Sequence, residues 1–210
     1  MSEIRVAQGR FLSFEGIDGS GKSTQARSLA QALRGLGLPV VLTREPGGSP
    51  GAEDIRRLVL QGDPDRWSAA TEALLFTAAR RDHLEKTIRP ALEQGSVVIT
   101  DRFADSTRIY QGLRGDAGVV DRLHDLMIGI EPDLTVLIDL DPGVGLGRAV
   151  ARAGPEQRFE AMGLGLQTRM RAGFLQLAAR HPRFVVVDGA RDPAVIAADV
   201  LARARVHLGV

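Results

Sequence analysis

The chain has 210 residues, of which 44% are hydrophobic and 25% charged, a composition typical of a soluble globular protein. Its formal net charge of +1 offers no basic excess for holding a nucleic-acid backbone, and with no cysteine it excludes thiol catalysis, disulfides and thiolate zinc sites. There is no apolar run of 18 residues and no signal-peptide pattern, so we expect one cytoplasmic domain over 1–210 that binds neither membrane nor nucleic acid.

The first predicted element is a strand at 11–15, followed by G-x-x-x-x-G-K-S and then by a helical pattern. Strand, loop and helix in this order are the setting of a P-loop, whose glycines turn backbone N–H groups inward around a phosphate. We expect Lys22 to reach the β- and γ-phosphates and Ser23 to ligate Mg²⁺. A dinucleotide fingerprint is excluded because its third glycine would fall on Thr24. The expected ATP-binding residues of the loop are Gly16, Ile17, Asp18, Gly19, Ser20, Gly21, Lys22, Ser23 and Thr24.

Further short apolar runs at 39–43, 96–100, 134–139 and 184–187 are rich in β-branched residues, which is typical of buried parallel strands. Amphipathic helical patterns lie between them, at 118–130 and at 68–88, where the apolar positions are Leu74, Leu75, Ala78, Leu84 and Ile88. This alternation predicts an α/β fold with helices on both faces of a parallel sheet. In such sheets ligands bind at the carboxyl ends of the strands.

The residues after the second apolar run read TREPGG. Arg44 in this position can bind a second anion through two parallel hydrogen bonds, although a lone arginine is more often a solvated surface residue. Pro46 followed by two glycines predicts a tight turn that brings the backbone close to a ligand.

The helical pattern at 68–88 places Phe76 and Arg80 four residues apart, on one face. An aromatic ring beside a planar cation suits a nucleobase, through stacking and edge hydrogen bonds. The competing interpretation is that Phe76 belongs to the core.

The third apolar run ends in TDRF. Asp101 is placed to accept from Mg²⁺-bound water, and Arg102 could span the phosphates of donor and acceptor; a structural Asp-Arg pair is the alternative. Further along, Tyr110 and Gln111 offer a phenol and an amide, of which the tyrosine could equally be core. The glycine- and arginine-rich region 143–165 has weak apolar periodicity and is the one candidate for a mobile lid.

Taken together, these motifs resemble the bacterial thymidylate kinases over essentially the whole chain. The resemblance is carried by FEGIDGSGKSTQ, TREPGG, LLFTAARRDHLEKTIRPALEQG, VITDRFADSTRIYQG, PDLTVLIDLDP and RFE. It implies a P-loop NTPase fold with a five-stranded parallel sheet, and transfer of the ATP γ-phosphoryl group to thymidine 5′-monophosphate (dTMP) with Mg²⁺. It also implies a homodimer. The alternatives are another P-loop small-molecule kinase or a nucleotide-regulated binding module.

The resemblance also implies a role for each site residue. Phe76 would stack on thymine, Arg80 would bond its carbonyl edge, and Arg44 with Arg102 would hold the acceptor phosphate. Asp18 would approach the 3′-hydroxyl and the transferring group. The full set of expected acceptor residues is Asp18, Arg44, Phe76, Arg80, Arg102, Ser106, Tyr110 and Gln111.

Catalytic cations in this family come from the P-loop or from the lid. The P-loop interior here carries no arginine, so Arg152 and Arg158 in the lid are expected to join Asp18, Lys22 and Arg102 in catalysis, with Arg148 over the adenine. Val150 stands where relatives often carry another arginine, and Gln157 where they usually carry an acid. Which lid arginine is catalytic is therefore open.

Overall fold

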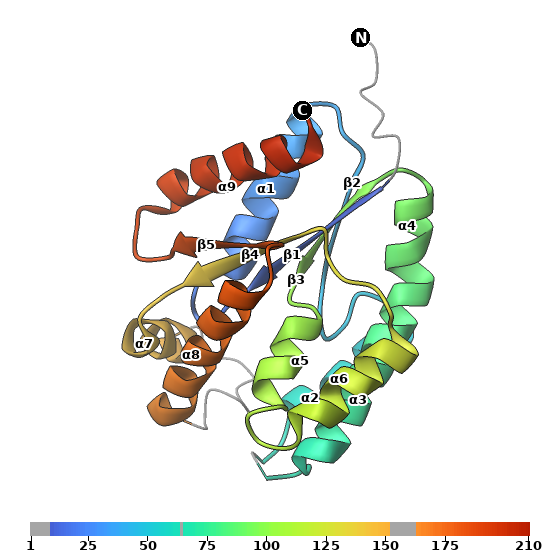
Figure 1. The fold of residues 1–210 in the computed structure, drawn as a ribbon, viewed down its shortest axis with the longest axis vertical. Coiled ribbons are helices and arrows are strands. Elements are labelled where there is room, and N and C mark those ends of the chain that lie inside the picture. Colours follow the sequence, from blue (N-terminus) through green and yellow to red (C-terminus); the bar gives the residue numbers. More distant parts are fainter. Residues whose placement is uncertain (1–8, 64, 152–162) are drawn as a thin grey trace.

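The computed structural model describes residues 9–63, 65–151 and 163–210, and it contains a five-stranded parallel sheet in the order β2-β3-β1-β4-β5 (Figure 1). The α/β class and the five predicted strands are confirmed, and each strand end lies within one residue of its predicted position. The strands are β1 (Arg10–Glu15), β2 (Val40–Arg44), β3 (Val97–Asp101), β4 (Leu134–Asp139) and β5 (Phe184–Asp188).

Some of the helices begin or end at residues that satisfy free backbone groups. The Ser68 hydroxyl accepts from the backbone N–H of Thr71 at the start of α3 (Ala69–His83), and Gly209 closes α9 (Pro193–Leu208) in a left-handed conformation. The helical elements, including the π-helical turn η1, are α1 (Lys22–Gly35), α2 (Pro50–Leu60), α3 (Ala69–His83), η1 (Leu84–Ile88), α4 (Arg89–Glu93), α5 (Ala104–Tyr110), α6 (Ala117–Met127), α7 (Pro142–Ala151), α8 (Leu164–Arg180) and α9 (Pro193–Leu208). Among the helices of the described ranges, none is both long and apolar enough to cross a membrane.

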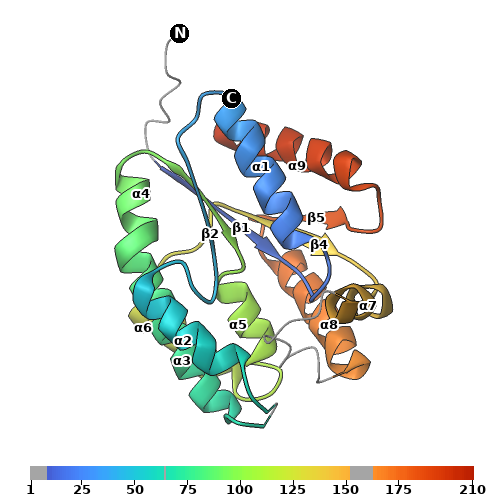
Figure 2. The ribbon, with the colours of Figure 1, turned by 180° about the vertical axis from the view of Figure 1, so that it is seen from behind.

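Helices cover both faces of the sheet, as Figures 1 and 2 show from opposite sides. Leu12 and Phe14 of β1 belong to the core cluster that includes α1 and α9. Phe11, on the opposite face of the same strand, packs with η1 and the start of α5, and α8 covers that face near β4. Because both faces are buried, the strands read as continuous apolar runs rather than as alternating ones.

One expectation about the pattern at 68–88 is wrong. Leu74 and Ala78 were expected on the buried face of this helix, but Leu74 is 57% exposed and Ala78 is also exposed. The buried stripe of α3 is instead partly charged, because its polar groups find hydrogen-bond partners in the neighbouring elements, which makes their burial tolerable. These buried polar residues are Glu72, Thr77, Arg80 and His83.

The predicted lid begins in α7, which is capped by the Asp141 carboxylate accepting from the N–H groups of Gly143 and Val144. Its central part, including Arg152 and Arg158, lies outside the described residues. Lid movement stays a prediction.

Candidate functional site

The sheet brings the ends of β1, β2 and β3 to one edge. Phe14 pairs with Asp101 between β1 and β3, and Arg44 pairs with Asp101 between β2 and β3. The glycine-rich loop, the TREPGG turn and the Asp-Arg pair therefore lie next to one another, although more than 80 residues separate the first from the last along the chain. This is the edge where open α/β sheets bind ligands.

The glycine-rich loop needs its glycines for two separate reasons. Gly16, Gly19 and Gly21 have φ angles of 140°, 75° and 99°, which side-chain-bearing residues rarely adopt. In addition, a Cβ at Gly16 would lie 2.6 Å from the carbonyl oxygen of Ile138, and one at Gly19 would collide with the carbonyl oxygen of Gly145. The loop is therefore shaped by close contact with β4 and α7.

Lys22 is held inside this loop. Its Nζ donates to the carbonyl oxygen of Ile17 at 2.7 Å, and only 6% of the residue is exposed. Burial, with the nearby positive charge of Arg102, lowers the pKa of Lys22 to about 8. A bound anion would favour the charged ammonium form of Lys22, so the loop is suited to binding negative charge. Thr24, the last residue predicted for the loop, is exposed on the first turn of α1.

Ser23 and Asp101, the two predicted metal ligands, are in contact. The Ser23 hydroxyl donates to Oδ2 of Asp101, and both residues line a cavity of about 470 Å³ together with Arg44. A hydroxyl and a carboxylate fit Mg²⁺, which prefers oxygen ligands and usually binds through one or two carboxylates plus phosphate oxygens and water. The donor set therefore suits a magnesium ion brought in with a phosphate.

Arg44 lies on the wall of this cavity rather than deep inside it. Its side chain is 56% exposed and pairs with Glu53 at 3.3 Å, and the same glutamate accepts from the N–H of Gly48 at 3.0 Å. The next residues, Glu45 and Pro46, are joined by a cis peptide bond and line a second pocket.

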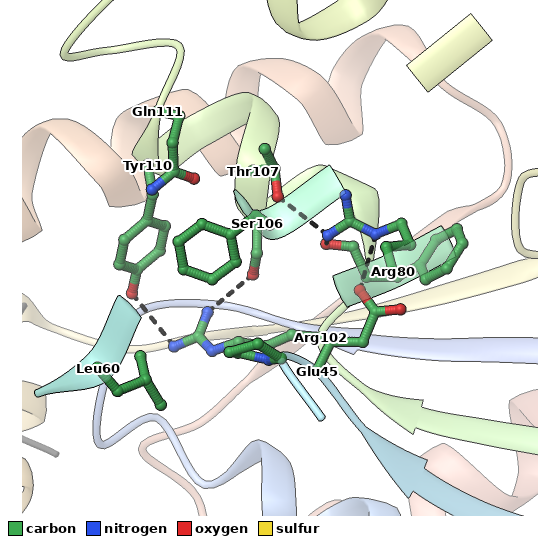
Figure 3. A pocket seen from close by; sticks show the side chains of 11 residues that line it. Glu45, Leu60, Arg80, Arg102, Ser106, Thr107, Tyr110 and Gln111 are labelled. Atoms are coloured by element: carbon green, nitrogen blue, oxygen red, sulfur yellow. Dashed lines mark hydrogen bonds and ion pairs between the residues drawn. The ribbon is translucent and has the colours of Figure 1, made fainter. Parts of the chain in front are cut away.

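This second pocket gathers side chains from the β2–α2 loop, α2, α3 and the segment from Arg102 to Gln111, as Figure 3 shows. All the predicted acceptor residues line it except Asp18 and Arg44. Phe76 is half-buried there, consistent with either a stacking or a packing role. The lining residues are Glu45, Pro46, Leu60, Phe76, Arg80, Arg102, Phe103, Ser106, Thr107, Tyr110 and Gln111.

Arg102 connects the loop to the second pocket. Its Nη1 donates to the Gly16 carbonyl oxygen at 3.1 Å and to Oγ of Ser106 at 2.8 Å. Its Nη2 donates to Asp18 at 2.6 Å and to the Tyr110 hydroxyl at 3.1 Å. The backbone of Arg102 has φ 72°, a left-handed conformation that non-glycine residues seldom adopt and that clusters at functional sites.

Asp18 remains a carboxylate in this site. Burial alone would raise its pKa, but the positive charges of Arg102 and Lys22 outweigh burial, and hydrogen bonds from Gln167 and Tyr110 add to them, so the pKa lies below its ordinary value. The Gln167 amide donates to Asp18 at 3.0 Å from α8 and is fully buried. Sequence reasoning missed Gln167; a lone amide among the apolar positions of its helix was the available signal.

Arg80 is oriented by partners that sequence reasoning also missed. It is 4% exposed; its Nε donates to Glu45 at 2.7 Å, and its Nη2 donates to the Thr107 hydroxyl at 2.9 Å. The other Glu45 oxygen lies 3.0 Å from Nδ1 of His83, which must donate because a carboxylate only accepts. The histidine thus has a structural role, because it helps to hold Glu45 in place.

Glu15 is a second buried acid at the site that the sequence did not single out. One oxygen accepts from the N–H of Phe103 at 2.8 Å and the other from the Ser106 hydroxyl at 2.6 Å. Burial, reinforced by the nearby carboxylate of Asp105, raises the pKa of Glu15 to about 7. This carboxyl ties the end of β1 to the start of α5 and orients the serine that meets Arg102.

Arg148 is exposed on α7, the helix whose Gly145 meets the glycine-rich loop. The two predicted catalytic arginines beyond it lie outside the described residues.

Comparison with known proteins places this geometry in one family. A family model described as thymidylate kinase matches residues 14–200. Thymidylate kinase from Ruegeria pomeroyi is 68% identical over 95% of this chain and 96% of its own length. Thymidylate kinase from Dinoroseobacter shibae is 66% identical over 92% of this chain and 95% of its own length. The crystal structure of thymidylate kinase from Ehrlichia chaffeensis matches with a TM-score of 0.77 at 36% identity, covering 94% of this chain and 99% of that one.

Proposed function

The chain belongs to the thymidylate kinase family, and we propose that its glycine-rich loop binds ATP while the second pocket binds dTMP. The reaction transfers the γ-phosphoryl group of ATP to dTMP and gives ADP and dTDP. The observation that carries this assignment is Arg102, whose guanidinium bonds to the loop through Gly16 and Asp18 and to the pocket through Ser106 and Tyr110. A cation at that junction can reach the phosphates of both substrates.

The ATP end rests on the backbone N–H groups of the loop, the N-terminus of α1 and the Lys22 ammonium, all of which stabilise phosphate oxygens. Mg²⁺, carried in with ATP, would be held by Ser23 and by Asp101, the latter directly or through water. The ion would neutralise phosphate charge; the oxygen donors of this pair support that assignment.

The dTMP end rests on Phe76 for stacking, on Arg80 for the base carbonyl, and on Arg102 with Arg44 for the acceptor phosphate. Asp18 and Tyr110 would surround the sugar, and their mutual hydrogen bond of 2.9 Å supports a joint role. Because Arg44 is exposed and paired with Glu53, this role requires it to exchange that partner for phosphate.

The bond that breaks joins the γ-phosphorus to the bridging oxygen of ADP, and the bond that forms joins that phosphorus to an oxygen of the dTMP phosphate. The acceptor is already an anion, so no general base is required. Charge spreads over the equatorial oxygens of the transferring group, and preorganised cations and N–H groups stabilise it. Lys22 and Arg102 are the described cations nearest this path.

The lid over 143–165 would add further positive charge. In this proposal Arg152 and Arg158 contact the transferring group and Arg148 covers the adenine, with the lid forming part of one domain that spans 1–210. The start of the lid in α7, next to the loop, supports this arrangement.

A homodimer forms part of the proposal as well. The support is an apolar surface on α3 and α6, where Leu74, Leu126 and Met127 are 57%, 79% and 44% exposed. Large exposed side chains gathered on neighbouring helices are typical of a surface that another subunit covers.

A coupled assay of ADP formation tests the function. We expect ADP release from MgATP to require dTMP, to fall sharply with other nucleoside monophosphates, and to disappear in a folded Lys22→Ala variant. Equal release with and without an acceptor would indicate a nucleotide-regulated binding module. A stronger response to a different acceptor would indicate another P-loop kinase.

A further inference from the structure

Glu72 is a buried carboxylate behind the second pocket, on α3 one turn before Phe76. It is 0% exposed, and its Oε2 accepts from Nε2 of Gln111 at 3.0 Å and from Nη1 of Arg114 at 2.6 Å. Arg114 and Glu72 form an ion pair at 2.6 Å, so this buried carboxylate has a cationic partner inside the protein.

This contact decides which way the amide of Gln111 points. An ionised carboxylate has no hydrogen to donate, so only the NH₂ end of the amide can face Glu72. The carbonyl oxygen of Gln111 must then lie on the other side of the amide. Gln111 lines the pocket, and in Figure 3 its oxygen lies on the side of Arg80, with Ser106 and Thr107 between the two residues.

Arg80 supplies a hydrogen-bond donor to the pocket, whereas Gln111 supplies an acceptor. Its guanidinium donates only, and Glu45 and Thr107 hold it in place. The pocket therefore offers one fixed donor, from Arg80, and one fixed acceptor, from Gln111. Thymine and uracil carry a carbonyl oxygen next to an N–H group, which complements this pair. Cytosine carries an amino group next to an unprotonated ring nitrogen. Its donor would therefore face the Arg80 donor, and its acceptor would face the Gln111 acceptor.

We propose that Glu72 is a positioning residue for base selection: by fixing the amide of Gln111 with its oxygen toward the base, it makes the pocket favour thymine over cytosine. The inference rests on the proposed function, since it deepens the choice of acceptor. Glu72 itself does not line the pocket in the described part of the chain, so it acts through Gln111.

The test is calorimetric binding of dTMP and dCMP to the full chain and to Glu72→Gln. A glutamine at this position can donate or accept, so the amide of Gln111 can turn over and the ratio of the two dissociation constants should fall about tenfold or more. Loss of packing alone would weaken both nucleotides by the same factor. A folded Glu72→Gln variant with an unchanged ratio overturns the proposal.

The exchange Glu72→Gln with Gln111→Glu provides a second variant in case the first does not fold. The amide at position 72 would donate to the carboxylate at position 111, and the second oxygen of that carboxylate would still accept from thymine. The preference for dTMP over dCMP should therefore equal or exceed that of the unchanged chain. A lost preference in the folded exchange variant also overturns the proposal. Failure of the unchanged chain to phosphorylate dTMP would instead refute the proposed function, and that measurement comes first.

Discussion

At the scale of single residues, the site depends on buried charges that each have a defined partner. Asp18 stays ionised because it pairs with Arg102, whereas burial and the nearby Asp105 carboxylate raise the pKa of Glu15, which forms no ion pair among the described residues, to about 7. Two acids a few residues apart therefore differ in charge near neutral pH because their neighbours differ. Each can be tested by a substitution that changes the charge and preserves the shape.

Glu15→Gln should change how stability depends on pH. A carboxyl whose pKa is raised on folding stabilises the fold below its ordinary value of 4.5, and this contribution is lost as pH rises through about 7. The unchanged chain should therefore lose about 3 kcal/mol of stability, relative to Glu15→Gln, between pH 4.5 and pH 8. Urea unfolding at both pH values measures this difference, with the exposed Glu93→Gln as a control for lost charge. A difference that does not vary with pH would contradict the expectation.

Phe76→Ala should weaken dTMP binding by about 1–3 kcal/mol, the usual value of a base–aromatic stack, and leave ATP affinity unchanged. Separate titrations of dTMP and ATP measure the two affinities. Leu75→Ala, on the same helix and outside the pocket lining of the described residues, is the matched control. If Phe76→Ala weakens both nucleotides equally, or only lowers the melting temperature, Phe76 belongs to the core.

At the scale of elements, the glycine-rich loop and α7 fit each other through backbone contact. A Cβ at Gly19 would collide with the carbonyl oxygen of Gly145, whereas Gly37, at φ 84°, has open space around it. These two glycines separate the cost of a strained φ from the cost of displacing the loop.

Gly37→Ala should cost about 1 kcal/mol of stability and leave ATP affinity unchanged. Gly19→Ala should cost at least as much and also weaken ATP binding by about tenfold or more, because the loop must move away from α7. Thermal unfolding and ATP titration of both variants measure the two effects. Equal ATP affinity in the two variants would show that the contact with α7 does not shape the phosphate site.

At the scale of the whole molecule, the exposed apolar surface on α3 and α6 has no counterpart within one chain that covers it in the described residues. Leu74→Asp and Leu126→Asp should convert a dimer into a monomer, because each places a charge in an interface that excludes water. Light scattering after size-exclusion chromatography measures the mass of each variant. Val206→Asp, at an 86% exposed apolar residue on α9, is the matched control. A monomeric unchanged chain, or a dimer that survives both substitutions, would refute the homodimer.

The strands, the α/β class and the loop with its glycines and Lys22 could be predicted from the amino-acid sequence, because these depend on signals between near neighbours. The motif spacing also pointed to the family that the comparisons found. Which side chains come into contact depends on the packing of distant segments: Gln167 bonds to Asp18 across 149 residues of chain, and Glu72 bonds to Gln111 across 39. This packing also decided that Leu74 is exposed while charged residues of the same helix are buried. The physical reason is that hydrophobic periodicity reports only average burial, whereas a buried polar group is tolerated or not according to partners that distant segments supply.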